Sequence, residues 1–271
     1  FVLDRVTGAF LQELDLGNDP AHVMTRVDTQ QVHVGLNGED GVKEMNRLPN
    51  GLLEVNRLIS MQDPHNPTKQ TQPHAHWMGF DGKHMVTPNS NSADSTLYEF
   101  IGRNWGKVIS KNETGAISIA TGMMPDSSKY YVSNYLGHSI SVMNGPEKKK
   151  WYGKWYAPGQ KIKDISLIAG YDLVKGCQVI NDVNTCVDGL IGGLPVQTPV
   201  SPDGKFVIIG NTLGGTIAII RTSDDTLVKL IPCDPGCHGV NFGAKKGGGY
   251  YAYVTSKFAN RMIVLDYDHN N

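Results

Sequence analysis

The stretch Thr198-Pro-Val-Ser-Pro-Asp-Gly-Lys-Phe-Val-Ile-Ile-Gly-Asn211 places a turn centred on Asp203 directly before an apolar strand. Two further stretches, Pro73–Asn89 and Met124–Asn134, repeat this order of small or His-containing strand, Asp or Asp-Gly turn and second strand. The phrase recurs loosely about five times, and a third strand follows the next polar turn. A repeat of this content is typical of the blade of a β-propeller. We therefore predict an all-β propeller of four-stranded blades.

The spacing of the turns supports this prediction. The turn positions are Asp28, Asp81, Asp126, Asp203 and about Lys246. Two of the intervals, 45 and 43 residues, match one four-stranded blade. The other two intervals, 53 and 77 residues, are longer. We expect insertions there, at about 37–56 and 147–194.

Alternation of apolar residues and β-branched or aromatic content predict the individual strands. Expected second strands are 31–34, 84–87, 130–133, 206–209 and 250–255. Expected third strands are 216–220 and 261–266, and expected outer strands are 9–14 and 226–231.

The sequence leaves the number of blades open. About five to six blades are visible, whereas a closed propeller commonly has seven or eight. The sequence begins at Phe1 with what reads as third- and fourth-strand sequence. We expect residues 1–271 to form a single propeller domain that lacks N-terminal blades, although one insertion hiding a degenerate blade would also account for the count.

Composition excludes several classes of function. The chain has 25 basic and 26 acidic residues and a net charge of −1, so it has no broad basic surface for nucleic acid. No run of 18 apolar residues exists, so no membrane span is expected. Catalytic motifs such as a nucleophile elbow, a phosphate-binding glycine loop or His-Glu-x-x-His are also missing from the sequence. The sequence therefore favours a binding protein over an enzyme.

The four cysteines form two local pairs, Cys177 with Cys186 and Cys233 with Cys237. In a turn-rich β protein they indicate short-loop disulfides and a periplasmic or extracellular location. Reduced thiols in a cytosolic protein are the alternative. The sequence Cys233-Asp-Pro-Gly-Cys-His238 also resembles the attachment motif of haem c, with a spacer of three residues in place of two. Covalent haem at Cys233, Cys237 and His238 is thus a second interpretation.

Several repeats resemble those of a known family. Tyr131-Val-Ser-Asn134 followed by Ile140–Asn144, and Tyr253-Val-Thr-Ser256 with Ile263–Asp266, are similar to the YVTN repeat. The resemblance covers most of the chain outside the expected insertions. It implies a secreted or periplasmic propeller of seven or eight blades, similar to surface-layer YVTN proteins and to the propeller domain of haem-d nitrite reductases. It implies little about activity, because propellers host unrelated functions.

Histidines gather at the expected inner strands, which surround the axis of a propeller. The candidates are His22, His74, His76 and His238. Imidazoles converging from three blades would suit a copper or zinc ion. His74 and His76 strengthen this hypothesis, since they share one face of a strand. Histidines that only bond the neighbouring backbone are the structural alternative, and His33 reads as an ordinary strand residue.

A Lys-, Trp- and Tyr-rich run in the second expected insertion is a candidate partner surface, because aromatic and cationic side chains are common anchors of interfaces. Its residues are Lys148, Lys149, Lys150, Trp151, Tyr152, Trp155 and Tyr156. A solvated hairpin is the alternative.

Three functions remain open from the sequence. The preferred one is an extracytoplasmic propeller that acts as a binding or scaffold subunit with other protein subunits of a redox or surface assembly. It would carry a histidine site for copper or zinc. The second is a redox protein with haem c. The third is a structural surface protein with no cofactor.

Overall fold

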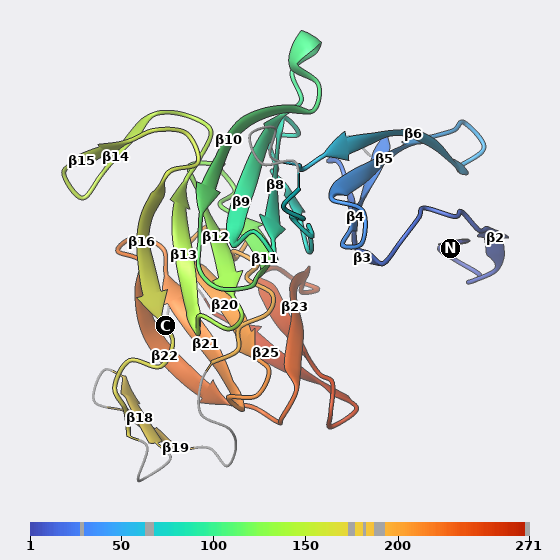
Figure 1. The fold of residues 1–271 in the computed structure, drawn as a ribbon. Coiled ribbons are helices and arrows are strands. Elements are labelled where there is room, and N and C mark those ends of the chain that lie inside the picture. Colours follow the sequence, from blue (N-terminus) through green and yellow to red (C-terminus); the bar gives the residue numbers. More distant parts are fainter. Residues whose placement is uncertain (28–29, 63–67, 173–176, 181–182, 187–192, 269–271) are drawn as a thin grey trace.

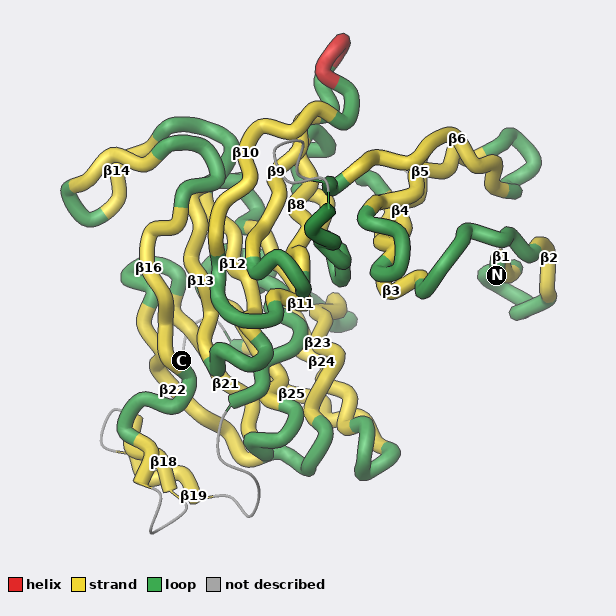
Figure 2. Tube along the Cα trace, in the orientation of Figure 1, coloured by secondary structure: helices red, strands yellow, loops and turns green. Residues whose placement is uncertain are grey.

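The computed structural model describes residues 1–27, 30–62, 68–172, 177–180, 183–186 and 193–268. It is an all-β protein whose five blades follow one another around a common axis as a β-propeller (Figure 1). Strands and turns dominate, and the one helical element in the described ranges is the short 3-10 helix η1 at Gly102–Asn104 (Figure 2). The predicted fold class is confirmed.

The first three blades each have four antiparallel strands. Blade 1 contains β3 (Pro20–Thr25), β4 (Gln31–Leu36), β5 (Gly41–Arg47) and β6 (Leu53–Ser60). Blade 2 contains β7 (Trp77–Met78), β8 (His84–Asn89), β9 (Asp94–Glu99) and β10 (Lys107–Glu113). Blade 3 contains β11 (Ser118–Met123), β12 (Lys129–Asn134), β13 (Ser139–Asn144) and β16 (Lys161–Ser166).

The last two blades show three strands each. Blade 4 contains β20 (Phe206–Asn211), β21 (Thr216–Arg221) and β22 (Thr226–Pro232). Its inner segment pairs with β20 through two isolated bridges, Pro195 with Asn211 and Val200 with Val207. Blade 5 contains β23 (Cys237–Ala244), β24 (Tyr250–Ser256) and β25 (Arg261–Tyr267).

Three small sheets lie outside the blades. They are β1 (Val2–Leu3) with β2 (Phe10–Gln12), β14 (Lys149–Trp151) with β15 (Lys154–Tyr156), and β17 (Tyr171–Asp172) with β18 (Cys177–Ile180) and β19 (Val183–Cys186). The β14–β15 hairpin leaves the blade body between β13 and β16 (Figure 1).

The Asp turns form as their sequence predicts. Asp81 Oδ1 accepts the Lys83 N–H at 2.8 Å, and Asp126 Oδ1 accepts the Ser128 N–H at 3.0 Å. This local bonding of the Asp side chain to the backbone two residues on is what makes Asp favourable in turns. The same turn forms at Asp203 of blade 4, whose Oδ1 accepts the Lys205 N–H at 3.1 Å, whereas the predicted turn residue Asp28 lies outside the described residues.

Four apolar clusters of the core each lie between two neighbouring blades, and a fifth joins blade 1 to Leu14 and Leu16 of the segment before it. One cluster joins Val86 and Leu97 of blade 2 to Met123, Tyr130 and Val132 of blade 3. The next cluster contains Tyr131, on the opposite face of β12, with residues of blade 4. Strands such as β12 are buried on both faces, so nearly every side chain along them is apolar or hydrogen-bonded. Packing between blades, rather than within one sheet, therefore holds the propeller together.

The expected insertions look different in the structure. Residues 37–56 contain β5 and the beginning of β6, which are regular third and fourth strands of blade 1. The pattern is hard to recognise because β5 carries Lys43, Glu44 and Asn46. Range 147–194 contains β16, the fourth strand of blade 3, between two excursions from the blade. The expected missing N-terminal blades stay a prediction.

Candidate functional site

A cavity of about 390 Å³ opens at the end of the propeller where the inner strands begin. It is lined from blades 2 to 5, and its polar side chains are those of His74, Tyr135, Thr212, His238 and Lys257. The rest of the wall is aliphatic apart from Phe258. This volume and mixture are typical of sites for small molecules. We call this cavity the axial pocket.

His74 is the most defined of the polar groups in the axial pocket. Its Nδ1 lies 2.8 Å from the carbonyl oxygen of Ile119 in blade 3. Because a carbonyl can only accept, Nδ1 carries the proton and Nε2 is left as the basic nitrogen. Burial lowers the pKa of His74 below its ordinary value, opposed by the Ile119 carbonyl and the charge of Asp19. His74 is therefore a neutral base at pH 7.

His238 and Lys257 bring further charge to the same pocket. Burial lowers the pKa of His238, and the positive charge of Lys257 and the nearby His74 lower it further. The loop before His238 is held by Thr212, whose hydroxyl donates to the Cys237 carbonyl at 2.9 Å. The pocket thus combines one ammonium group with two neutral imidazoles, which suits an anionic or carbonyl-containing ligand.

Two glycines allow the histidine-bearing segments to sit close to the preceding blade. A Cβ at Gly35 of β4 would lie 2.5 Å from the carbonyl oxygen of His74. A Cβ at Gly210 of β20 would lie 3.1 Å from the backbone nitrogen of His238. Both glycines occupy second strands, and each contacts the histidine segment of the following blade. The close approach of two backbones therefore sets the position of both histidines.

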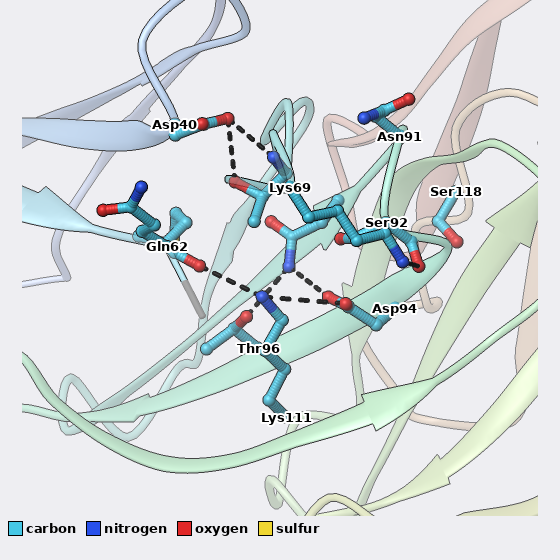
Figure 3. Close-up of polar contacts among 12 residues, drawn as sticks. Asp40, Gln62, Lys69, Asn91, Ser92, Asp94, Thr96, Lys111 and Ser118 are labelled. Atoms are coloured by element: carbon cyan, nitrogen blue, oxygen red, sulfur yellow. Dashed lines mark hydrogen bonds and ion pairs between the residues drawn. The ribbon is translucent and has the colours of Figure 1, made fainter. Parts of the chain in front are cut away.

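The segment before His74 is fixed by polar contacts to blade 1 and within its own blade, and Figure 3 shows those of Asp40. Asp40 Oδ1, in the turn between β4 and β5, accepts the N–H groups of Thr71 at 2.7 Å and of Gln72 at 2.9 Å. Within blade 2, Asn91 in the β8–β9 turn donates from Nδ2 to the Gln70 carbonyl at 2.7 Å. Beyond His74, the backbone N–H of Ala75 donates to Ile119 at 2.9 Å. These bonds hold His74 in register with blade 3.

His76 points away from this arrangement into a separate buried cluster. Its side chain is fully buried, and its ring lies 5.5 Å from that of His22 and 6.4 Å from that of His33, centroid to centroid. Neither ring nitrogen of His76 has a hydrogen-bond partner among the described residues. Burial holds the pKa of His76 well below its usual value, and burial with the nearby His74 lowers that of His22 to about 4. The rings of His22, His33 and His76 therefore lie together, and those of His22 and His76 are neutral at pH 7.

The structure therefore divides the four predicted histidines. His74 and His238 belong to the axial pocket, whereas His22 and His76 belong to the buried cluster. His33, which the sequence presents as ordinary strand decoration, joins that cluster and also contacts the buried Glu44 at 3.1 Å. Among the described residues no group of three or more His, Cys, Asp or Glu side chains is arranged to hold a metal ion. The copper or zinc site stays a prediction.

Both predicted disulfides are present. Cys177 is bonded to Cys186, and Cys233 is bonded to Cys237. With the second pair oxidised, neither sulfur is free to form a thioether to haem, so the disulfide interpretation of Cys233-Asp-Pro-Gly-Cys-His238 is the one the structure supports. Residue His238 lies instead in the axial pocket.

The Lys-, Trp- and Tyr-rich run forms the β14–β15 hairpin. Trp155 is 62% exposed, while Trp151 is partly covered and donates from Nε1 to Asn144 Oδ1 at 2.8 Å. The hairpin follows β13, so it lies at the end of blade 3 opposite the β12–β13 turn. That turn supplies Tyr135 to the axial pocket. The hairpin and the axial pocket are therefore at opposite ends of the propeller.

Solved structures share the fold of this chain, whereas sequence comparisons find no match. No protein-family model matches the chain, and no curated protein matches its sequence. Solved structures do match in shape. A proposed 6-phosphogluconolactonase from Bacteroides uniformis superposes with a TM-score of 0.66 at 17% identity, covering 99% of this chain and 73% of its own. A corresponding protein from Bacteroides fragilis gives 0.66 at 14% identity, covering 100% and 73%.

The periplasmic gluconolactonase PpgL of Pseudomonas aeruginosa gives a TM-score of 0.62 at 14% identity, covering 92% of this chain and 66% of its own. At these identities the likeness establishes the β-propeller fold and nothing about activity. No helix in the described ranges is long and apolar enough to cross a bilayer.

Proposed function

We propose that this propeller binds and hydrolyses the lactone of a sugar acid in the axial pocket. The observation that carries the proposal is His74, a neutral imidazole whose Nδ1 is bonded to the Ile119 carbonyl and whose ring lines a cavity that also contains Lys257. The names of two groups of similar structures, 6-phosphogluconolactonase and periplasmic gluconolactonase, point to the same chemical class.

The chemistry required is the addition of water to an ester carbonyl. His74 Nε2 would accept a proton from water as the water oxygen bonds to the lactone carbonyl carbon. The ring C–O bond then breaks, and the leaving oxygen takes up a proton to become a hydroxyl group. The product is an open hydroxy acid, whose carboxylate adds negative charge near Lys257. Lactone plus water therefore gives the acid with no other reactant.

The test is a lactonase assay with two substrates, δ-gluconolactone and its 6-phospho derivative, with the spontaneous rate subtracted. In His74→Asn the amide still offers a donor to Ile119 but lacks a base, so kcat/KM should fall by about 10²–10⁴. In Lys257→Ala the KM for the phosphorylated substrate should rise more than that for the neutral one. The matched control is His84→Asn, because His84 is bonded to Asp81 at 2.7 Å at the other end of the propeller.

A wild-type protein with no lactonase activity on either substrate would exclude hydrolysis. Calorimetric titration with gluconate and 6-phosphogluconate then decides whether the pocket is a binding site for the acid. Unchanged kcat/KM in His74→Asn would show that the base lies elsewhere.

We further propose that the chain works outside the cytoplasm and that its blades are of the YVTN type. The two disulfides support the location, since such bonds persist in oxidising compartments. The Tyr-Val-Ser-Asn134 and Tyr-Val-Thr-Ser256 phrases support the repeat type, as both end the second strand of a blade. Thiol counting on protein exported to the periplasm of a bacterial host, with and without denaturant, tests the location: two intact disulfides are expected.

Copper or zinc is a second candidate function, for one specific reason. The ring nitrogens of His76 and the Nδ1 of His22 lack partners among the described residues, and imidazole is the usual protein ligand of both metals. Elemental analysis of the natively purified protein tests this candidate. Metal that survives in wild type and disappears in His22→Ala/His76→Ala would support it, and metal-free wild-type protein would exclude it.

A further inference from the structure

The β14–β15 hairpin presents two faces that differ in their surroundings. The pairing of Lys149 with Tyr156 and of Trp151 with Lys154 places these four residues on the face that turns toward the blades. The pairing of Lys150 with Trp155 places these two on the opposite face. On that outer face the Lys148 ammonium lies 5.7 Å from the centre of the Trp155 ring. An exposed tryptophan is thus flanked by two lysines.

The hairpin is held firmly although its outer face is exposed. Asn144 Nδ2 donates to the carbonyls of Glu147 and Ala157, each at 2.8 Å, which closes its base. Its tip is held by the Tyr152 hydroxyl, which donates to Asp225 Oδ2 of blade 4 at 2.7 Å. No described residue needs Trp155 for packing, since the side chain is 62% exposed. The fold therefore fixes an aromatic side chain in solvent.

The local charge is strongly positive. Residues 147–156 contain Lys148, Lys149, Lys150 and Lys154, all exposed, and one acidic residue, Glu147. The nearest carboxylates of blade 4 already have cationic partners: Asp225 is paired with Lys129 and Asp224 with Arg221. Lys149 interacts with Asp126 of blade 3, whereas Lys148 and Lys150 on the outer face keep their charge available for a partner.

From this geometry we infer that the hairpin binds the anionic surface of a lipid bilayer. The hairpin projects from the blade body and carries Trp155 exposed on its outer face, so a flat surface can reach this side chain (Figure 1). Tryptophan and tyrosine favour the membrane–water interface, and lysines beside them are drawn to anionic headgroups. With few lysines and one exposed tryptophan the binding is reversible and sensitive to salt. Because the axial pocket is at the other end of the propeller, it stays open in the bound state.

The test is co-sedimentation with sucrose-loaded vesicles of phosphatidylcholine containing 30% phosphatidylglycerol, compared with pure phosphatidylcholine. We expect binding to the anionic vesicles only, weakened by 0.5 M salt. Lys148→Glu/Lys150→Glu should reduce the binding constant at least tenfold. The matched control is Lys229→Glu/Lys246→Glu, which makes the same change in net charge at exposed lysines of blades 4 and 5 and should bind as wild type.

Trp155 supplies an independent signal. Its fluorescence should shift to shorter wavelength on anionic vesicles, and Trp155→Ala should lose that shift and bind several-fold more weakly. The inference is wrong if wild type does not bind the anionic vesicles, if both charge variants lose binding equally, or if the protein binds soluble polyglutamate or polygalacturonate but no vesicle. Lactonase activity of vesicle-bound protein is a separate readout, so failure here leaves the axial pocket untouched.

Discussion

Lys129 of blade 3 and Asp225 of blade 4 form a buried ion pair, with 2.8 Å between Nζ and Oδ1 and side-chain exposures of 2% and 0%. The same carboxylate accepts the hydroxyls of Tyr131 and Tyr152, both at 2.7 Å. The Lys129 ammonium also donates to the Thr222 carbonyl at 2.6 Å. Blade 3, blade 4 and the β14–β15 hairpin therefore meet at the buried Asp225 carboxylate, which has both a counter-charge and hydrogen-bond donors.

Lys129→Met should lower the free energy of unfolding by about 3 kcal/mol, because it leaves a buried carboxylate without its counter-charge. Denaturant unfolding followed by tryptophan fluorescence measures this change. The matched control is Lys161→Met, whose partner Asp164 is 44% exposed and whose loss should change stability by less than about 1 kcal/mol. Equal effects of the two substitutions would mean that the buried pair contributes no more than a surface pair.

Gly35→Ala should destabilise the protein and weaken the axial pocket together. The new methyl group would lie 2.5 Å from the His74 carbonyl oxygen, and a backbone atom cannot move away without displacing the strand. We expect a loss of about 2 kcal/mol in unfolding free energy and a reduced affinity for sugar acids. In Gly239→Ala the nearest atom is the Thr255 hydroxyl at 3.0 Å, which a side-chain rotation can remove, so a smaller loss is expected. A larger loss in Gly239→Ala would contradict this account.

Stability should fall as the pH is lowered from about 6.5 to about 4. In the folded state burial lowers the pKa of His22 to about 4, while the unfolded chain titrates near 6.5. Between these values the unfolded state binds more protons, so acid favours unfolding, and His76 shifts in the same direction. The expected loss is on the order of 3 kcal/mol. It is measured by denaturant unfolding at a series of pH values.

The loss of stability caused by protonation of the buried histidines can be separated from the loss caused by protonation of carboxylates. The pKa of Glu44 is lowered to about 2, although burial opposes this, by hydrogen bonds from His33, Trp105 and Asn56. Glu44 therefore stabilises the fold fully above about 4.5, and its contribution is lost only below that value. His22→Gln/His76→Gln should flatten the stability curve between pH 6.5 and 4.5. A curve that keeps its slope in this variant would rule out the buried histidines as the cause.

Lactonase activity should persist below the ordinary histidine pKa. Since burial lowers the pKa of His74, its basic form remains at pH values where an exposed imidazole is already protonated. The acid limb of kcat/KM should then lie below pH 6.5, and removing the flanking positive charge in Lys257→Ala should move it little, because burial is the first cause at His74. The pH profile of initial rates measures this. An acid limb above pH 6.5 would assign the base to another group.

The sequence by itself determined the blade. The blade repeat consists of an Asp turn followed by a second strand that is apolar on both faces. Both features depend on residues adjacent in the chain, so the second strands could be predicted: β4, β8, β12, β20 and β24. The two disulfides were predictable for the same reason, because each closes a loop of a few residues. The strand β5 could not be predicted reliably, because it carries the charged Glu44 at a buried position. Glu44 is stabilised there by hydrogen bonds with His33 of β4 and Trp105 of blade 2, which the local sequence does not reveal.

Only the tertiary structure decided which histidines share a site. His74 and His76 are two residues apart and looked like one ligand pair, yet one ring lines the axial pocket and the other contacts His22 and His33. The division depends on Ile119 and Lys257 of other blades, whose distance in sequence hides their proximity. Turn formation depends on consecutive residues and can be predicted from the sequence. The burial and pairing of charged groups depend on how the blades pack against one another.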